Sequence, residues 1–250
     1  MVKRKIVVAV AMHNNSNEIR RCLISILRQV NIERQIHIVI GNDNSFDDWK
    51  SQIEDILHIN HKVISILNLN NSNVVKTRNE INTYILKNLT EVDLIARLDA
   101  DDEYSNADVL SKIEQIFNSN SPDLILAGNY LRLNNTIISR VNKSSRKLLD
   151  KKYLKDRVFN MSQGDSNAEL PSCNLFIKPS VLIPYPNIES GEDHLLLIKY
   201  LLSNTYKWHF AEEILAVNYN LNGSTTLSNK KKNTYISCRE EMYNMLLLNE

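Results

Sequence analysis

The sequence predicts an α/β protein whose mostly parallel sheet is flanked by helices. Apolar, β-branched runs at 5–11, 36–40, 62–67 and 92–98 alternate with segments of helical apolar spacing, in the order β-α-β-α-β-α-β. The run 5–11 is continuously apolar after Lys5, which is typical of a strand buried on both faces. Because ligands of such sheets bind beyond the carboxyl ends of the strands, we expect the chemistry in the loops that follow these four runs.

The intervening segments have the spacing of amphipathic helices. In the first of them Ile19, Leu23, Ile26 and Val30 recur on one helical face. The second half is less regular, and we expect a smaller unit there. The further predicted elements are helices at 46–58, 73–88, from 105 on, 190–202 and from about 230, strands at 172–177, 207–210 and 214–219, and a hairpin of 123–133 with 136–141.

Composition excludes several classes of function. The net charge of +1 over 250 residues gives no general basic field, which argues against nucleic acid as a partner. Three widely spaced cysteines form neither a metal-binding pattern nor a disulfide framework, which favours a reducing, cytoplasmic compartment. The basic start followed by the 5–11 run imitates a signal peptide, but the run is short and suits a first strand better. No apolar stretch approaches the ~20 residues that cross a bilayer.

The strongest chemical signal is the segment ARLDADDEYS at 96–105. Asp99 and Asp101 are two residues apart directly after a buried strand, so extended backbone points them to the same side. Unpaired carboxylates at this density repel each other, and Mn²⁺ or Mg²⁺ shared with a substrate diphosphate would relieve the repulsion. Alternatively, they are acids at a helix N-terminus, favoured there by the macrodipole. Their place at the end of a strand favours function.

Two polar segments follow other strands and carry weaker signals. Asp43, within GNDNS at 41–45, could hydrogen-bond a nucleotide base or ribose, or could form an ordinary turn. Arg78, within VVKTRNE at 74–80, could meet a base carbonyl or a phosphate, or could lie on a solvated helix face. Each segment alone favours the structural interpretation.

A fourth segment places two carboxylates at the start of a very apolar helix. Glu192 and Asp193 lie within ESGEDHLLL at 189–197. They could cap the helix, or one could act as a general base that the leucines behind it partly desolvate. One carboxylate would suffice as a cap, so the pair raises the weight of the catalytic interpretation.

In this order and spacing the motifs resemble family 2 glycosyltransferases of the Rossmann-like GT-A fold, over about residues 4–225. Asp-x-Asp alone is common, but several motifs in register are specific. The matching segments are the opening strand with its nucleotide loop (6–14), the Asp-Asp-Gly-Ser equivalent (42–45), an Arg-Asn pair in 77–79, the Asp-x-Asp motif in 98–102, and Gly-Glu-Asp (191–193).

The resemblance implies roles for particular residues. Asp43 would read the base with support from Arg78, Asp101 would be the principal metal ligand, and Asp99 would contact the ribose or the metal. Asp193 would deprotonate the acceptor hydroxyl with Glu192 beside it, giving inversion at the anomeric carbon. The implied donor-binding set is Ala11, His13, Asn14, Asp43, Arg78, Asp99, Ala100 and Asp101.

The sequence departs from the family pattern in two places. Gly41 and Asn42 stand where an apolar residue and an Asp are usual, and Asn44 replaces Gly, which puts the identity of the base in doubt. Family members often carry a late His near the donor diphosphate, whereas no His follows His209 here. Asn222, Ser224 or water could substitute for it.

We therefore expect a cytoplasmic, metal-dependent inverting glycosyltransferase. It would transfer a hexose or N-acetylhexosamine from a nucleotide diphosphate, UDP in first place, to a bacterial surface glycan or lipid-linked acceptor. The basic stretch 143–157, with seven basic and two acidic residues, could face an anionic acceptor or the inner face of the membrane, although a solvated helix face is the simpler interpretation. The expected division is a catalytic domain (1–228), with a nucleotide-sugar half (1–104) and an acceptor-side half (105–228), and a helical tail (229–250).

Two rival functions remain open. The altered 41–44 segment and the missing late His favour an inactive nucleotide- or sugar-binding module of the same fold, while the intact Asp99, Asp101 and Asp193 argue against it. A nucleotidyltransferase would also join such a sheet to a metal-binding carboxylate. It ranks lower because the loop AMHNNSNE is neither glycine-rich nor basic.

Overall fold

A computed structural model describes residues 3–133, 137–220, 229 and 233–248. Its strands are β1 (Lys5–Met12), β2 (Gln35–Asp43), β3 (Ile64–Leu69), β4 (Val92–Arg97), β5 (Glu103–Tyr104), β6 (Leu124–Leu133), β7 (Ile137–Asn142), β8 (Leu175–Ile177) and β9 (Trp208–Asn220). Its α-helices are α1 (Ile19–Leu27), α2 (Trp49–Gln52), α3 (Glu54–Asn60), α4 (Val74–Asn88), α5 (Val109–Asn120), α6 (Lys151–Ser162), α7 (Glu192–Leu202) and α9 (Thr234–Leu247).

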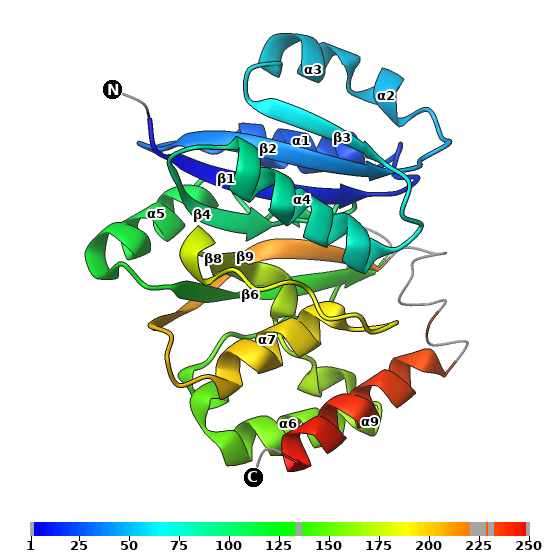
Figure 1. Ribbon diagram of the computed structural model, residues 1–250, viewed down its shortest axis with the longest axis vertical. Helices are drawn as coiled ribbons and strands as arrows, with labels where there is room; N and C mark the ends of the chain where they lie inside the picture. Colours follow the sequence, from blue (N-terminus) through cyan, green and yellow to red (C-terminus); the bar gives the residue numbers. More distant parts are fainter. Residues whose placement is uncertain (1–2, 134–136, 221–228, 230–232, 249–250) are drawn as a thin grey trace.

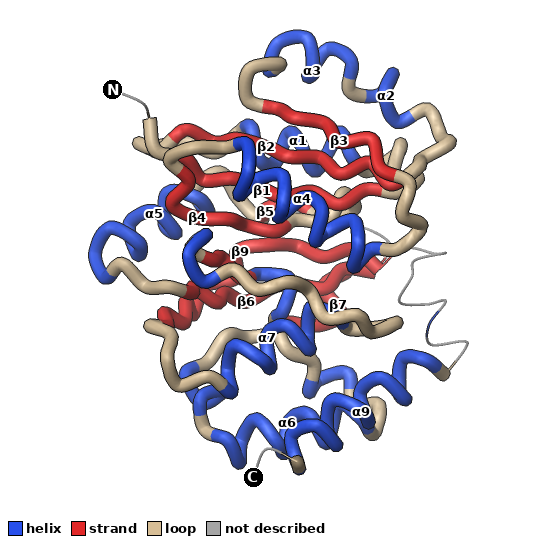
Figure 2. Tube along the Cα trace, viewed as in Figure 1, coloured by secondary structure: helices blue, strands red, loops and turns tan. Residues whose placement is uncertain are grey.

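Within these residues the strands form one sheet in the order β3-β2-β1-β4-β8-β6-β9-β5, with β7 paired to β6 (Figures 1 and 2). The pairs β1–β2, β1–β4, β2–β3 and β6–β9 are parallel. The short β8 runs antiparallel to both β4 and β6 and thereby joins the two parallel groups. The predicted α/β architecture with a mostly parallel sheet is confirmed.

Several predicted elements differ in detail from the structure. The helix predicted at 46–58 is divided at Ile53, whose fully buried side chain sits on non-helical backbone between α2 and α3. The two strands predicted at 207–210 and 214–219 are one continuous strand, β9. The predicted hairpin is present as the antiparallel pair β6–β7, while its turn at 134–136 lies outside the described residues.

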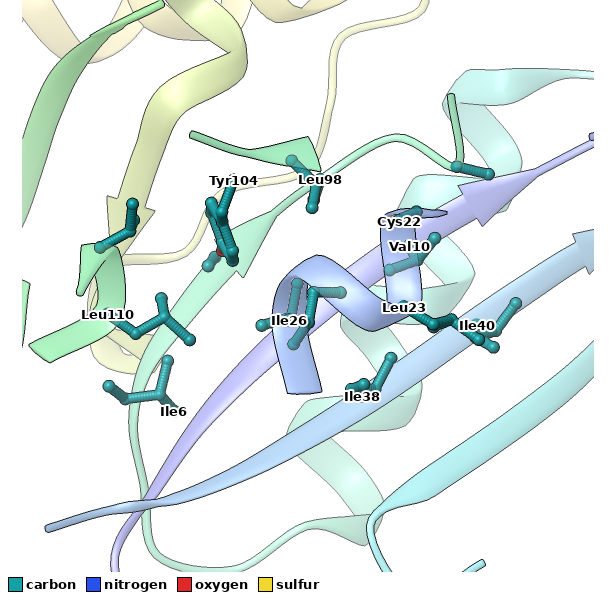
Figure 3. Packing of buried hydrophobic residues seen from close by; sticks show 14 of the residues in the cluster. Ile6, Val10, Cys22, Leu23, Ile26, Ile38, Ile40, Leu98, Tyr104 and Leu110 are labelled. Atoms are coloured by element: carbon teal, nitrogen blue, oxygen red, sulfur yellow. The ribbon is translucent and has the colours of Figure 1, made fainter. Parts of the chain in front are cut away.

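The two faces of the sheet bury different sets of side chains because residues alternate along a strand. Ile6, Val8 and Val10 of β1 point to the face covered by α1 and α5, and Figure 3 shows part of this cluster. Val7 and Ala9 point to the opposite face, where α4 packs. One strand therefore supplies two cores, which explains why its sequence is apolar throughout.

A third apolar cluster is formed by residues within 124–246, in the second half of the chain. Leu175 and Ile177 of β8 face α7, while the intervening Phe176 faces the α1 side of the sheet. Met242 and Leu246 of α9 belong to the same cluster as the leucines of α7. The C-terminal helix α9 thus packs against the same cluster as α7 through apolar side chains.

Gly41 is explained by the packing of α4 on β2. A Cβ at this position would lie 2.6 Å from Cδ1 of Ile81 and 3.3 Å from Cγ2 of Thr77. The unusual residue in the 41–44 segment therefore reflects a close approach of helix and strand.

We expect Gly41→Val to lower the free energy of unfolding by about 1–3 kcal/mol, because the added methyl groups overpack a buried contact with Ile81. Denaturant unfolding measures the change. The Gly41→Val/Ile81→Ala double variant should recover part of the loss, since truncation of Ile81 makes room. Strictly additive losses from the two substitutions would contradict this explanation.

Candidate functional site

The loops that follow β1 and β2 are joined by hydrogen bonds. The backbone N–H of Asn14 donates to Ser45 Oγ at 2.9 Å, and Asn14 Oδ1 accepts from the backbone N–H of Phe46 at 2.9 Å. His13 Nδ1 lies 2.6 Å from the carbonyl oxygen of Asp43, and its Nε2 lies 3.0 Å from Asn14 Nδ2. A carbonyl can only accept, so Nδ1 carries the proton and Nε2 accepts from the amide. The orientation of the His13 ring is therefore defined from both sides.

Asp43 anchors the loop that precedes α4. Its carboxylate accepts the backbone N–H groups of Asn71 at 2.7 Å, Ser72 at 3.0 Å and Asn73 at 3.1 Å. Burial alone would raise the pKa of Asp43, but these hydrogen bonds outweigh it and the pKa is lowered. Asn73 in turn caps α4 by accepting the N–H of Lys76. The predicted role of Asp43 in reading the base stays a prediction.

Two largely buried arginines converge on Asp99, just after the end of β4. Nη2 of Arg78, from α4, lies 3.0 Å from both carboxylate oxygens of Asp99. Nε of Arg97, the last residue of β4, donates to the same carboxylate at 3.1 Å. Asp99 is therefore neutralised by two guanidinium groups within the protein.

The same arginines reach the first turn of α7. Arg78 Nη1 donates to the carboxylate of Glu192, and Arg97 Nη1 lies 3.2 Å from Oδ2 of Asp193. Ser172 Oγ donates to Asp193 Oδ2 at 2.9 Å. The predicted metal motif and the predicted catalytic motif, some 90 residues apart in sequence, thus form one charged network.

The pKa values of the network follow from burial and these contacts. Burial would raise the pKa of Asp99, but the charges of Arg78 and Arg97 lower it to about 2. Burial also acts to raise the pKa of Asp193. The pKa is nevertheless held well below the ordinary value by His194, by the positive charges of Arg97 and Arg78, and by the hydrogen bond from Ser172, which act together. Both carboxylates are anionic at neutral pH.

Asp101 has different surroundings from Asp99. Among the described residues no ion pair includes its side chain, and burial together with the charge of Asp99 raises its pKa to about 6. Its backbone is held by Arg21, which donates to the carbonyl oxygen at 2.6 Å. The neighbouring Ala100 donates its N–H to the carbonyl oxygen of Ala11 at 3.2 Å, so the loop continues the pairing of β1 with β4.

These surroundings suit a divalent cation. Within the described ranges no three His, Cys, Asp or Glu side chains gather as a complete metal site. Mg²⁺, however, is usually held by one or two carboxylates together with substrate phosphates. A desolvated carboxylate beside a second negative charge, with Arg21 bound to the backbone carbonyl and not in an ion pair with the side chain, fits that arrangement. Asp101 is the residue that would hold the ion. Asp99 could help to bind it only through a carboxylate that is already paired with Arg78 and Arg97.

The structure brings Arg78, Asp99 and Glu192 into direct contact, and Arg97 links Asp193 to them through Asp99. It places His13 and Asn14 on a separate loop pair at the same edge of the sheet. Sequence reasoning missed Arg97, Ser172 and Tyr185, whose ring lies 5.5 Å from the Arg78 guanidinium. The position of Arg97, directly after the apolar run 94–96 and directly before the Asp-x-Asp motif segment 98–102, was the available signal for it. Ser172 and Tyr185 carried no such signal.

The sequence matches the model of a known protein family. The model of the family described as Glycosyl transferase family 2 matches residues 7–176, more than half of the chain. The chain belongs to glycosyl transferase family 2. No curated protein matches this glycosyltransferase.

Solved structures share the fold of this family 2 glycosyltransferase. The S. aureus TarS fragment 1–349 in complex with UDP-GlcNAc has a TM-score of 0.65 at 16% identity, covering 98% of this chain and 72% of the fragment. Another TarS structure has a TM-score of 0.60 at 16% identity, covering 97% of this chain and 43% of its own. The mannosyltransferase PcManGT from Pyrobaculum calidifontis, with GDP-Man and Mn²⁺, has a TM-score of 0.60 at 11% identity, covering 93% and 61%.

Family and fold together support a glycosyltransferase that uses a nucleotide sugar. The resemblance to GT-A enzymes inferred from the motifs is confirmed. Among the helices of the described residues, none combines the length and apolarity of a membrane span.

The network predicts a large stability effect of Arg97. Arg97→Met should lower the free energy of unfolding by about 1–3 kcal/mol, because the largely buried Asp193 carboxylate would lose its guanidinium partner. Denaturant unfolding at neutral pH tests this. Arg20→Met, which breaks the exposed ion pair with Asp55, is the control and should have little effect. Equal effects of the two substitutions would contradict the assignment of a buried network.

Proposed function

We propose that this glycosyltransferase transfers a hexose or N-acetylhexosamine from a UDP donor to a hydroxyl of a bacterial surface glycan or lipid-linked acceptor, with inversion. The observation that carries the proposal is the anionic carboxylate of Asp193, which Arg97 and Ser172 hold in the same network as Asp99. A proton acceptor thereby lies beside the motif that would hold the metal and the donor diphosphate.

The charge of the network supports metal dependence. Two guanidinium groups, of Arg78 and Arg97, face three carboxylates, of Asp99, Glu192 and Asp193, which leaves one net negative charge. Asp101 adds carboxylate charge nearby. A nucleoside diphosphate would be repelled by such a site. Bound Mn²⁺ or Mg²⁺, held by Asp101 with Asp99 beside it, would neutralise charge on the departing diphosphate.

Asp193 would act as the general base. It would accept the proton of the acceptor hydroxyl while that oxygen bonds to the anomeric carbon and the bond to the diphosphate breaks. The nucleoside diphosphate leaves with the bonding electrons. One base and one displacement give a product of inverted configuration. Glu192, buried and paired with Arg78, would keep the arginine in place beside this carboxylate.

The proposed classes of donor and acceptor are supported by structures of the same fold and by exposed basic residues. Structures of the same fold were solved with UDP-GlcNAc and with GDP-Man, and the former has the higher TM-score. Lys143, Arg146, Lys147, Lys151 and Lys152 are exposed in or before the start of α6. They would favour an anionic acceptor or peripheral contact with an anionic membrane surface.

A thermal-shift panel of UDP-, GDP-, dTDP- and CDP-sugars, with and without Mn²⁺, tests donor binding. We expect UDP-sugars to raise the melting temperature in a metal-dependent manner, since a ligand of the native state stabilises it by mass action. Asp101→Asn should remove the metal dependence, and the exposed Asp156→Asn serves as the control. If no donor shifts well-folded wild-type protein, a binding or catalytic role for this site fails.

Asp193→Asn tests catalysis separately from binding. We expect it to keep the donor-induced thermal shift and to lower kcat by about 10²–10⁴-fold, because the amide cannot accept the proton. NMR of the wild-type product should show an inverted anomeric centre. A donor-binding protein that transfers no sugar even as wild type would be a binding module, and a retained configuration would exclude the single displacement.

A further inference from the structure

The C-terminal helix reaches the catalytic turn through a buried arginine. Arg239 of α9 is only 3% exposed, and its Nη2 lies 3.3 Å from Nδ1 of His194. His194, itself buried, is the residue directly after Asp193. A guanidinium only donates hydrogen bonds, so Nδ1 must accept and the ring carries its proton on Nε2. The contact therefore selects both the tautomer and the orientation of the ring.

The arginine is itself held rigidly. Its guanidinium carbon lies 3.4 Å from the centre of the Tyr235 ring, and Nη1 donates to the carbonyl oxygen of Tyr235 at 3.0 Å. These two contacts come from one helical turn before it. A stacked, hydrogen-bonded guanidinium loses less entropy on binding a third group than a flexible lysine would.

The backbone of the turn packs on the same helix. Gly191 has a φ of 78°, and a Cβ there would lie 3.0 Å from Cε of Met242 and 3.4 Å from Nη1 of Arg239. The residue that begins the turn is thus a glycine both because of its left-handed conformation and because α9 approaches it closely. Both ends of the segment Gly191–His194 contact α9.

The catalytic turn is therefore held from two opposite directions. Arg78 and Arg97 bind the carboxylates of Glu192 and Asp193 from the nucleotide-sugar half. Arg239 binds the following His194 from the tail. Burial lowers the pKa of His194, which leaves the ring neutral and able to accept the hydrogen bond.

We propose that Arg239 is a positioning residue for transfer, which acts through His194 to set the place of the Asp193 carboxylate. The proposal rests on the catalytic function proposed above. It makes α9 part of the catalytic unit rather than an appended tail. Donor binding, which involves the opposite edge of the network, should not depend on Arg239.

The kinetic test compares Arg239→Met with Leu246→Ala. Leu246 is buried in the same apolar cluster, on the last turn of α9, and so controls for loosened packing of the helix. We expect Arg239→Met to lower kcat by about 10- to 100-fold with the donor KM nearly unchanged, since small displacements of a catalytic group have effects of this size. Leu246→Ala should lower the melting temperature without this loss of kcat, and Arg239→Lys should recover part of it.

A double-variant cycle tests the route through His194. If Arg239 acts through that ring, Arg239→Met/His194→Gln should lose no more kcat than His194→Gln alone. Multiplicative losses would show that Arg239 acts by another path and would overturn the proposal.

¹⁵N NMR of histidine-labelled protein gives a readout without substrates. The proposal expects His194 in the Nε2-protonated tautomer in the wild type, and a changed tautomer population or Nδ1 shift in Arg239→Met. A protonated Nδ1 in the wild type would overturn it. Absence of transfer by the wild type would refute the proposed function, whereas an active wild type with equal kcat losses in Arg239→Met and Leu246→Ala would refute only the positioning role.

Discussion

The ion-pair network of Arg78 and Arg97 with Asp99, Glu192 and Asp193 is the interaction on which the site depends. It joins α4 and β4, which share an apolar cluster through Ile81 and Ile95, to α7, whose leucines lie in another cluster. Because a buried charge without its partner is costly, each member holds the others in place. The two halves of the protein are therefore coupled at the position where donor and acceptor would meet.

The network also gives different pKa values to two carboxylates, Asp99 and Asp101, that are only two residues apart. The arginines lower the pKa of Asp99 to about 2, while Asp101, outside the pairs, has its pKa raised to about 6. Environments that separate the pKa values of neighbouring groups mark different chemical roles. The guanidinium groups of Arg78 and Arg97 neutralise Asp99, whereas a bound metal cation would suit Asp101. This difference makes a metal site of few protein ligands physically reasonable.

Much of the fold was predictable because apolar periodicity reports burial directly. The runs at 5–11 and 92–98 became β1 and β4, and the pair Glu192–Asp193 opens α7 as expected. Contacts between distant segments were not predictable from local pattern. Nothing near Arg97 in the sequence indicates Asp193, and nothing near Gly41 indicates Ile81. The three-residue β8 was extended in the prediction to 172–177, since its antiparallel neighbours, not its own composition, define its ends.

The contacts of the C-terminal helix were also not predictable from local sequence pattern, and one of them bears on the proposed function. The sequence predicts a separate helical tail at 229–250, because the local pattern does not indicate which element this helix packs against. In the structure, Met242 and Leu246 lie in the same apolar cluster as the leucines of α7. The polar residue that faces this cluster, Arg239, meets the residue after Asp193 and not solvent. A buried guanidinium is retained at a cost in free energy unless its contacts offset it. Since apolar residues alone could dock the helix, the arginine is better explained by the turn that it touches than by the packing that surrounds it.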